Sequence, residues 1–399
     1  EQSLGNRFNG IIERAYEQAG TQIAVIVDEY DVPLQHTYET EHHDECRTIY
    51  RDFFTGLKDY GYCIKCVFIT GITKFTQISL FSTLNTLVNI SFEESLAAVC
   101  GITNQELLSY FQKEIAMLSE KCNLSEAETI NEMKSLYDGY HFAPNMLNVY
   151  NPYSVLSAFS RGKLNSYWIA SGSNEMLFKI LNKFAKDIPK LDNSLIDSDY
   201  LEESDVNMID PKLFLYQAGY LTIKAVDGDT YILGYPNKEV KKSIYELILP
   251  LLLSKNIPEV NNELLQMRIA LKQTNVDQAM LSLKQLIADT PYSTQKRESF
   301  VLEEHFRFIL KNIFYLCGYT IHEEKQVAAG RIDLVAISET HIYIMELKME
   351  DNGGLKAASK QIQTRHYKDA FAASKKQVTC IVLSFSRESR GLEAWDIVE

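Results

Sequence analysis

The sequence predicts a multidomain α/β protein with an N-terminal parallel sheet, a mostly helical middle and a C-terminal α/β part. Three observations support this fold class. Residues 23–27 and 64–69 are apolar runs of strand length separated by a helical segment, a spacing typical of parallel strands. Apolar residues recur at near-helical spacing over residues 256–293. Residues 331–337 and 342–349 are neighbouring runs that each fit a buried strand.

The first predicted strand, residues 23–27, ends abruptly in Asp28 and Glu29. Buried parallel strands end in this way at the carboxyl edge of a sheet, where ligands bind. These two acids are therefore candidates for a ligand site. Capping of a following helix is the alternative role for both of them.

A helix is predicted over residues 45–60, and a second buried strand over residues 64–69 ends in Thr70. A third apolar segment, residues 87–92, is expected to complete a β-α-β pattern within a parallel sheet. Residues 1–145 are therefore expected to form one α/β domain.

The rest of the chain is predicted to divide into three further segments. Residues 146–255 are expected to be mostly helical, with a short hairpin over residues 221–233. Residues 256–294 are predicted to be an amphipathic helical connector, because their apolar residues follow a helical period. Residues 295–399 form the expected C-terminal domain.

The C-terminal hairpin carries the strongest functional signal. If its strands fold back through residues 338–341 and pair Ile337 with Ile342, the same register pairs Asp333 with Glu346. Paired residues have Cβ atoms about 4.5–5.5 Å apart. Alternation along the strand places Lys348 on the same face. Two opposed carboxylates in an apolar hairpin repel each other unless a positive charge lies between them.

A divalent cation between Asp333 and Glu346 would remove this repulsion, and Lys348 would do so less well. Carboxylate oxygens are the ligands that Mg²⁺ prefers, and the ion can polarise a phosphoryl oxygen and acidify a bound water. Lys348 could orient that water or neutralise charge on the phosphate. The pattern therefore predicts phosphodiester hydrolysis that depends on Mg²⁺ or Mn²⁺. A solvent-facing edge pair is the alternative interpretation of Glu346 and Lys348.

These residues resemble a known group. Asp333, the run Glu346-Leu347-Lys348 and the preceding Gly330-Arg331-Ile332 are similar to the PD-(D/E)XK nuclease superfamily, in the form found at the C-terminus of bacterial AAA-ATPase-like proteins. The resemblance implies a restriction-endonuclease-like α/β/α core. It also implies that Asp333 and Glu346 are metal ligands and that Lys348 is catalytic.

The same resemblance adds candidates outside the hairpin. The superfamily commonly takes a further metal-binding acid from the preceding helix, where Glu303 and Glu304 open an apolar helix. A solvated first turn near the helix dipole is the alternative for both. Related proteins also carry a Gln-Ile pair followed by Tyr, which adds Gln361 as a catalytic candidate.

A lysine-rich helix is predicted over residues 355–374. It carries Lys356, Lys360, Arg365 and Lys368 against the single acid Asp369. Such a face suits phosphate contacts beside a cleavage site. A solvated lysine face is the alternative.

The N-terminal acids resemble the Walker B arrangement, in which Asp28 would support Mg²⁺ and Glu29 would activate water, with Thr70 at a sensor position. No G-x-x-x-x-G-K-[ST] loop occurs in the sequence. The resemblance implies that this loop lies upstream, so that residues 1–145 are a partial P-loop-type ATPase remnant. ATP is therefore expected as a cofactor of the full-length family member, and no ATP hydrolysis is expected from this chain.

Resemblance to the family continues through the middle of the chain. It rests on segments that begin at Tyr137, Val149, Tyr167 and Gly219. Turns and core packing are the expected roles of these segments, since no chemistry follows from their residues.

Charge and composition limit the partners. The chain has 40 basic and 53 acidic residues and a net charge of −13, whereas residues 295–399 hold 15 of each sign. Contact with DNA or RNA is therefore expected to be local to the C-terminal domain. The longest apolar run, residues 247–253, is too short to span a bilayer, and a cytoplasmic location is expected.

Two functions follow from these patterns. The first is a metal-dependent nuclease coupled to an AAA-like ATPase module that is incomplete in this chain. The alternative is a nucleotide-controlled regulator that binds nucleic acid or a protein partner through an inactive nuclease fold.

Overall fold

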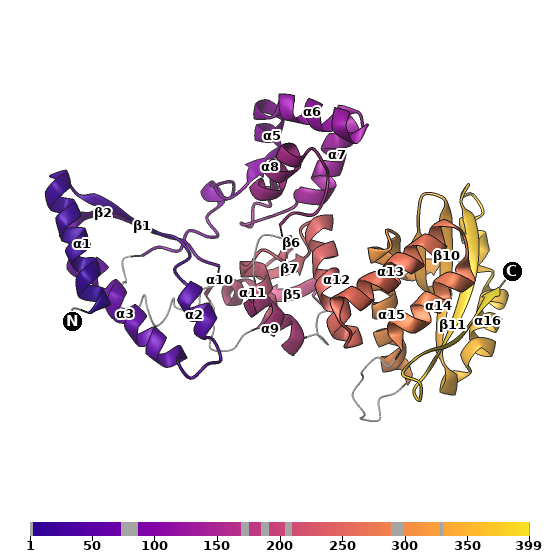
Figure 1. Cartoon of the computed structure of the whole chain (residues 1–399). Helices are drawn as coiled ribbons and strands as arrows, with labels where there is room; N and C mark the ends of the chain where they lie inside the picture. Colours follow the sequence, from indigo (N-terminus) through magenta and orange to yellow (C-terminus); the bar gives the residue numbers. More distant parts are fainter. Residues whose placement is uncertain are drawn as a thin grey trace. The chain divides into compact units, whose positions relative to one another are not determined.

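The computed structural model describes residues 3–72, 87–168, 175–184, 191–203, 210–288, 299–327 and 330–398 (Figure 1). The chain divides into two compact units, Glu1–Lys241 and Lys242–Glu399. The boundary between them falls inside helix α12 (Lys238–Leu253). Expected boundaries at 145, 255 and 294 stay predictions. None of the helices within the described ranges is both long and apolar enough to be a candidate membrane span.

The N-terminal part of the first unit contains the predicted pair of parallel strands. Strand β1 pairs with β2 in parallel, with Val25 opposite Val67 and Ile26 opposite Phe68. The helix expected over residues 45–60 is confirmed as α3. The elements in this part are α1 (Leu4–Ala19), β1 (Ile23–Val27), α2 (Val32–Thr37), α3 (His43–Asp59) and β2 (Ile64–Ile69).

The expectation that these strands are buried holds for only one face of the strand pair within the described residues. Val25 packs in a core with Ile12 of α1 and Phe54 of α3. On the opposite face, Ile26 is 74% exposed and Phe68 is 45% exposed. Within the described residues, helices therefore cover one face of the two-stranded sheet. An unbroken apolar run does not distinguish between one and two covered faces.

The predicted third strand over residues 87–92 was wrong. These residues are irregular and end in a turn. Val88 is 77% exposed and Ile90 is 40% exposed, whereas Leu87 packs against the core of the strand pair. The Asn89 side chain accepts a hydrogen bond from the Ser91 backbone N–H at 3.1 Å. Such a local bond stabilises a turn and competes with pairing in a sheet.

The remainder of the first unit consists of a helical cluster and a small antiparallel sheet. The hairpin expected over residues 221–233 is confirmed, since β6 pairs antiparallel with β7. The elements are β3 (Ile102–Thr103), α5 (Asn104–Tyr110), α6 (Gln112–Cys122), α7 (Glu126–Tyr137), β4 (Val149–Tyr150), α8 (Pro152–Arg161), α9 (Glu175–Lys183), β5 (Ser194–Asp197), α10 (Ser198–Glu203), α11 (Pro211–Gln217), β6 (Thr222–Asp227) and β7 (Thr230–Gly234). Of the segment that begins at Tyr167, residues 169–172 lie outside the described residues.

The second unit is built on a five-stranded mixed sheet in the order β12-β11-β10-β9-β8. Strands β10 and β11 are parallel, and every other neighbouring pair in this sheet is antiparallel. The elements are α12, α13 (Ile257–Lys272), α14 (Val276–Ile287), α15 (Ser299–Leu316), β8 (Thr320–Val327), β9 (Gly330–Ile337), β10 (His341–Met349), α16 (Gly354–Arg365), β11 (Gln377–Ser386) and β12 (Gly391–Val398).

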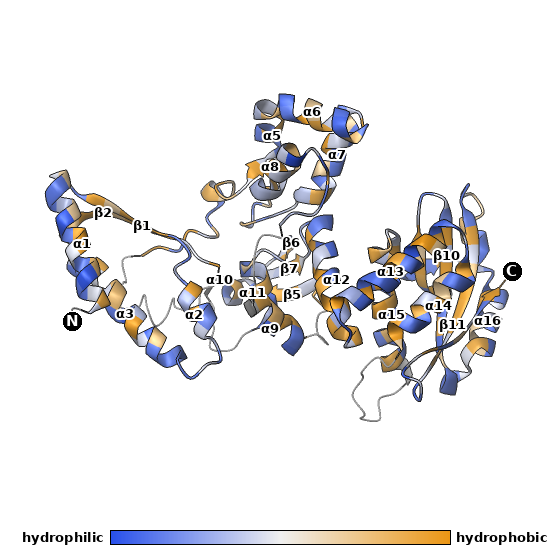
Figure 2. Cartoon of the chain, in the orientation of Figure 1, coloured by the Kyte–Doolittle hydropathy of each residue, from blue (hydrophilic) through white to orange (hydrophobic). Residues whose placement is uncertain are grey.

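Helices cover both faces of this sheet (Figure 1). On one face, Ala358 and Ile362 of α16 pack against Ile344. On the other, the rings of Phe306 in α15 and Phe385 in β11 are stacked at 4.3 Å. Figure 2 shows apolar residues along β10 and β11 and polar residues on the flanking helices. The mixed sheet between helices is consistent with a nuclease-like core.

The segment predicted as a connector belongs to this unit. It forms α13 and α14, which pack against each other, and α14 also packs against β12. The Trp395 ring N–H on β12 donates a hydrogen bond to Asp277 of α14 at 3.0 Å.

Candidate active site

The register expected for the C-terminal hairpin is confirmed. Ile342 lies opposite Ile337, and the pairing continues to Met345 opposite Leu334. Ser338 fixes the turn, because its N–H donates to the His341 carbonyl at 2.9 Å and its hydroxyl accepts from the His341 N–H at 3.0 Å. Asp333 and Glu346 follow next in this register.

Glu346 is a fully buried acid, with 0% exposure. Its Oε2 atom accepts a hydrogen bond from the Gln361 side-chain amide at 2.9 Å. Its Oε1 atom is also buried and has no partner with standard hydrogen-bond geometry among the described residues. Burial, and then the charge of Asp333 and a hydrogen bond with it, raise the pKa of Glu346 to about 9. A Glu346 carboxyl group with this raised pKa keeps its proton at neutral pH.

Asp333 is partly exposed and lies beside Glu346. Its Oδ2 atom accepts a hydrogen bond from the Leu347 N–H of β10 at 3.0 Å. This bond holds the side chain against the neighbouring strand. One partly solvated carboxylate and one buried carboxyl group thus meet at the same point of the sheet.

Gln361 is held in place by a second polar contact. Its amide also lies 3.3 Å from the Tyr367 hydroxyl, which donates to the Arg331 carbonyl at 2.7 Å. Tyr367 is fully buried. This chain of hydrogen bonds connects α16, the following turn and β9 at the carboxyl pair.

Arg365 lies directly over Gly330 at the start of β9. A Cβ atom on Gly330 would come within 2.2 Å of an Arg365 guanidinium nitrogen, and the φ angle of Gly330 is +138°. Only glycine adopts this backbone conformation readily. Gly330 therefore allows a cation to lie close to the strand that carries Asp333.

Lys348 and Glu303 form an ion pair at 3.9 Å. Glu303 also accepts hydrogen bonds from the Met349 N–H at 3.0 Å and from the Asn352 amide at 3.2 Å. Glu304 instead lies 3.9 Å from Arg307 and is 48% exposed. Of the two candidate acids, the structure thus brings Glu303 to the site strand and leaves Glu304 at the surface.

Asp333, Glu346, Lys348 and Gln361 are brought together at this site. Glu303 is linked to them through Lys348. Across the described ranges, no group of three or more histidine, cysteine, aspartate or glutamate side chains is placed to hold a metal ion. The four predicted metal ligands are therefore not gathered around one point.

The lysine-rich helix is shorter than expected. Helix α16 ends at Arg365, because His366 adopts a left-handed conformation with φ of 44°, and a 3-10 turn follows over Tyr367–Phe371. The prediction of one helix as far as residue 374 was wrong. Lys356, Lys360 and Arg365 are exposed on α16.

The N-terminal candidates lie at the ends of β1 and β2. The Thr70 hydroxyl donates a hydrogen bond to Asp28, and the Glu29 N–H donates to the same carboxylate at 3.0 Å. The Glu29 side chain is exposed. Sequence reasoning missed Asp31, which is fully buried and accepts hydrogen bonds from the Ile72 N–H at 3.2 Å and the Gln35 amide at 2.7 Å. The sequence feature that could have identified Asp31 is its position in the acidic run after β1.

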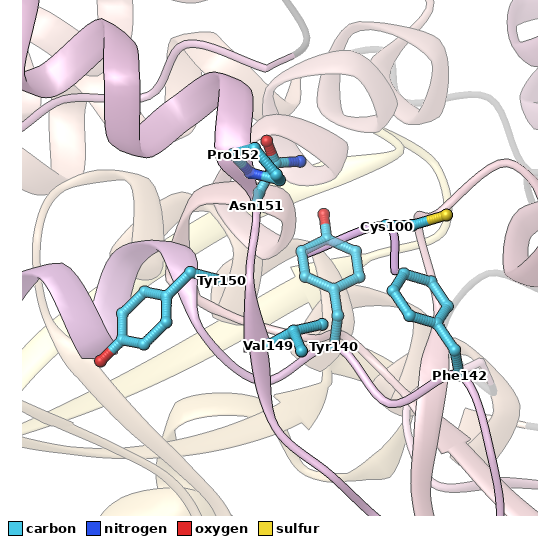
Figure 3. A pocket seen from close by; sticks show the side chains of 7 residues that line it. All are labelled: Cys100, Tyr140, Phe142, Val149, Tyr150, Asn151 and Pro152. Carbon is cyan, nitrogen blue, oxygen red and sulfur yellow. The ribbon is translucent and has the colours of Figure 1, made fainter. Parts of the chain in front are cut away.

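A small pocket in the first unit contains none of the predicted site residues (Figure 3). It is formed where two of the family-like segments meet, and Tyr140 and Phe142 stand beside each other in it. Its lining residues are Cys100, Tyr140, Phe142, Val149, Tyr150, Asn151 and Pro152. Tyr140 and Tyr150 are buried, which agrees with the core role expected for these aromatics.

Comparison with known proteins agrees with this geometry. Residues 301–395 match the family described as "PD-(D/E)XK nuclease superfamily". The second unit carries a PD-(D/E)XK domain. Residues 1–81 match the family described as "Predicted AAA-ATPase". The domain composition expected from the sequence is thus confirmed.

One relative is similar along almost the whole chain. It is a protein of Azotobacter chroococcum mcd 1 described as "Uncharacterized protein in vnfD 5'region". The two are 27% identical over 395 residues, which cover 97% of this chain and 73% of the relative. No solved structure matches the chain.

Proposed function

We propose that the PD-(D/E)XK domain is a nuclease that hydrolyses phosphodiester bonds in DNA or RNA with a divalent metal ion. The observation that carries this proposal is the contact between Asp333 and Glu346, a carboxyl pair at the centre of the sheet. A structural role alone gives no reason for placing two acids together in an apolar hairpin, since burial and mutual repulsion both disfavour it.

The residues present fit a hard divalent cation. Glu346 Oε1 is a buried oxygen without a partner at standard hydrogen-bond geometry among the described residues, and Asp333 beside it keeps solvent access. Mg²⁺ is commonly bound through one or two carboxylates, with water and substrate phosphates as its other ligands. Asp333 and Glu346 would hold the ion, which supplies charge stabilisation at the phosphate and a more acidic water.

The remaining side chains hold the carboxyl pair in place and supply positive charge. Gln361 holds Glu346 through its amide at 2.9 Å. Lys348 is 18% exposed and carries a positive charge at the same end of β10. We expect it to move from Glu303 toward the phosphate and to stabilise the charge that develops there. Glu303 acts as a positioning residue, since it holds Lys348 and the strand end.

The test is cleavage of single- and double-stranded DNA and RNA by the full chain, with Mg²⁺, with Mn²⁺ and with a chelator. Asp333→Asn and Lys348→Ala are each expected to lower the rate at least 100-fold while the circular dichroism spectrum is unchanged. Asp369→Asn, which alters an exposed acid of the same domain, is the matched control. Equal cleavage by Asp333→Asn and wild-type protein would refute the proposal.

A coupled role of the N-terminal segment is a further part of this proposal. Asp28 and Thr70 are hydrogen-bonded at the carboxyl ends of two parallel strands, where open α/β sheets bind ligands. We propose that these residues and Glu29 form part of a Mg²⁺-nucleotide site that controls the nuclease. A nucleotide-dependent change in cleavage rate that is lost in Asp28→Asn, within a chain extended upstream, is the expected result. No nucleotide dependence in that extended chain would contradict it.

A regulator that only binds nucleic acid is the second candidate. The ion pair between Lys348 and Glu303 favours it, because a lysine already paired with a carboxylate has less charge to offer a phosphate. This candidate predicts binding of nucleic acid without cleavage under any metal condition. The activity measurements above therefore separate the two candidates.

A further inference from the structure

Arg365 belongs to the face of α16 that carries Gln361. The two residues are four apart, so their side chains project from the same side of the helix, one turn from each other. Gln361 donates to the Glu346 carboxyl group at 2.9 Å. Arg365 lies over Gly330, where an added Cβ atom would come within 2.2 Å of a guanidinium nitrogen. One helix face therefore holds an amide and a guanidinium group in a row beside the carboxyl pair.

The Tyr367 hydroxyl connects this guanidinium group to the carboxyl pair. It lies 3.3 Å from the Gln361 amide and donates to the Arg331 carbonyl at 2.7 Å. Burial raises the pKa of Tyr367, while a hydrogen bond with Gln361 and the neighbouring charge of Arg365 act in the opposite direction. Two side chains, Tyr367 and Gln361, thus connect the charge of Arg365 to Glu346.

The same end of the hairpin carries Lys348. Strands β9 and β10 are antiparallel, so the start of β9 at Gly330 and the end of β10 after Lys348 lie at one end of the hairpin. Alternation along β10 places Lys348 on the same face as Glu346, which is the face that α16 covers. Lys348 at the end of one strand and Arg365 over the start of the other therefore lie to the same side of the carboxyl pair.

The two cations differ in how their charges are compensated. Lys348 lies 3.9 Å from the Glu303 carboxylate. Arg365 is exposed, and in the described ranges no carboxylate oxygen lies within 4.0 Å of its guanidinium group. Glu324, an acid of the neighbouring strand β8, pairs instead with two other arginines at 3.3 Å each. The charge of Arg365 is therefore available to a ligand.

A metal ion at the carboxyl pair would leave the substrate charge to be balanced. A doubly charged ion and two ionised carboxylates sum to zero, and so do Lys348 and Glu303. A phosphodiester brings one negative charge, and a second develops during attack by water. Of the two cations, Arg365 is the one that no nearby carboxylate compensates, and a guanidinium fork matches two phosphate oxygens.

We propose that Arg365 binds the phosphate group that is cut and neutralises the charge that this group carries before and during the reaction. Lys348 compensates the additional charge of the transition state. Gly330 permits the arrangement, because a side chain at this position would displace the guanidinium group. The inference rests on the proposed nuclease function, since it assigns how the same site holds its substrate.

A structural role of Arg365 is the alternative. It lies in the last turn of α16, where the helix dipole favours a basic residue, and it lies beside Tyr367. Two variants separate the roles. Arg365→Gln keeps a hydrogen-bond donor for the tyrosine and loses the charge. Arg365→Lys keeps the charge and loses the planar fork.

The first experiment measures binding without cleavage. Fluorescence anisotropy follows short labelled oligonucleotides of DNA and RNA, single-stranded and duplex, on the full chain with Ca²⁺ in place of Mg²⁺, at several concentrations of KCl. A gel checks that each oligonucleotide stays intact. Arg365→Gln is expected to weaken binding about tenfold and to reduce the salt dependence by about one phosphate contact. Arg365→Lys should stay within about threefold of the parent.

Lys360→Gln is the matched control. It removes the same charge from an exposed position of α16 that lies about 140° around the helix from Arg365. Its affinity should stay within about threefold of the parent. Equal binding by Arg365→Gln and the parent overturns the inference. A parent that binds none of the oligonucleotides overturns both this inference and the nuclease proposal.

The second experiment measures cleavage kinetics with Mg²⁺ or Mn²⁺. Arg365→Gln is expected to raise KM about tenfold with kcat within about threefold of the parent, because the contact exists in the ground state and the transition state alike. Lys348→Ala should instead lower kcat. An unchanged KM in Arg365→Gln, with or without a lower kcat, overturns the inference and leaves the nuclease intact. Binding that depends on Arg365 in a chain that cleaves nothing would uphold the phosphate contact and refute the nuclease.

Discussion

Replacing Glu346 by glutamine should abolish cleavage and yet stabilise the PD-(D/E)XK domain at neutral pH. The buried carboxyl group carries a proton because burial and Asp333 raise its pKa to about 9. A glutamine amide has nearly the same shape as this protonated acid and can donate to Asp333. The variant therefore retains the neutral form that the fold already favours, and loses the anionic form that a metal ion requires.

The magnitude follows from the change in pKa. The ordinary value for this carboxyl group is 4.5, and the folded value is about 9. One pH unit of difference is worth about 1.4 kcal/mol. At pH 7 the unfolded chain has released the proton, and folding must return it across roughly 2.5 units, which costs about 3 kcal/mol.

The sign of this effect sets the experimental window. Because the folded pKa of this acid is raised, the stabilising contribution is complete below pH 4.5 and is lost progressively as the pH rises toward 9. Glu346→Gln has no proton to exchange at this position. Its free energy of unfolding relative to wild type should therefore be about 3 kcal/mol more favourable at pH 7 than at pH 4.

The assay is urea unfolding of the full chain without metal, at several values of pH from 4 to 9. Trp395 lies in the second unit and reports its unfolding in a Trp168→Phe background. Glu304→Gln, which removes an exposed acid of α15, is the matched control and should show no comparable pH dependence. The reasoning fails if Glu346→Gln and its parent keep a constant difference in stability across this range.

Two further predictions concern the same site. The apparent affinity for Mg²⁺ should rise about tenfold per pH unit up to roughly pH 9, because binding must displace the proton from Glu346. Isothermal titration calorimetry at pH 6, 7 and 8 measures this affinity. An affinity that stays constant over this range would contradict the prediction. Gly330→Ala should lower the free energy of unfolding by about 1–3 kcal/mol, because the alanine must adopt a φ of +138° and Arg365 must move. The midpoint of urea unfolding measures this loss. An unchanged midpoint would show that the start of β9 relaxes without cost.

The hairpin register was predictable from two features of the sequence, the apolar pattern of the strands and the positions of the two acids. Apolar side chains occupy both faces of the two strands, and a shift of one residue would place Asp333 and Glu346 on different faces. The turn was less informative, since residues 338–341 are not a typical hairpin sequence. Ser338 provides the missing constraint through its side-chain bond to His341, a contact that composition alone does not reveal.

Helix rotation could not be predicted from the sequence. Glu303 and Glu304 are consecutive, so their side chains point about 100° apart around α15. Which of them faces the strand depends on how Phe306 packs against Phe385 on the sheet. That packing is a tertiary contact, and either choice fits the same apolar period.

Length and burial of the N-terminal strands were predicted only in part. The parallel pairing of β1 with β2 followed from their separation by a helix. The third segment failed because apolar composition alone does not create a strand: Asn89 offers the backbone a local hydrogen bond, and Val88 remains in solvent. Strand formation requires a neighbour to pair with, which a single sequence window does not contain.

A single proton connects stability and proposed activity at this site. Without metal, the proton on Glu346 removes the repulsion with Asp333, so the hairpin folds although it places a buried acid beside a second one. An ion that displaces this proton must supply at least the free energy that the proton contributed. The fold therefore favours strongly charged divalent ions over monovalent ones at Asp333 and Glu346, since only the former compensate both carboxylates once the proton has left.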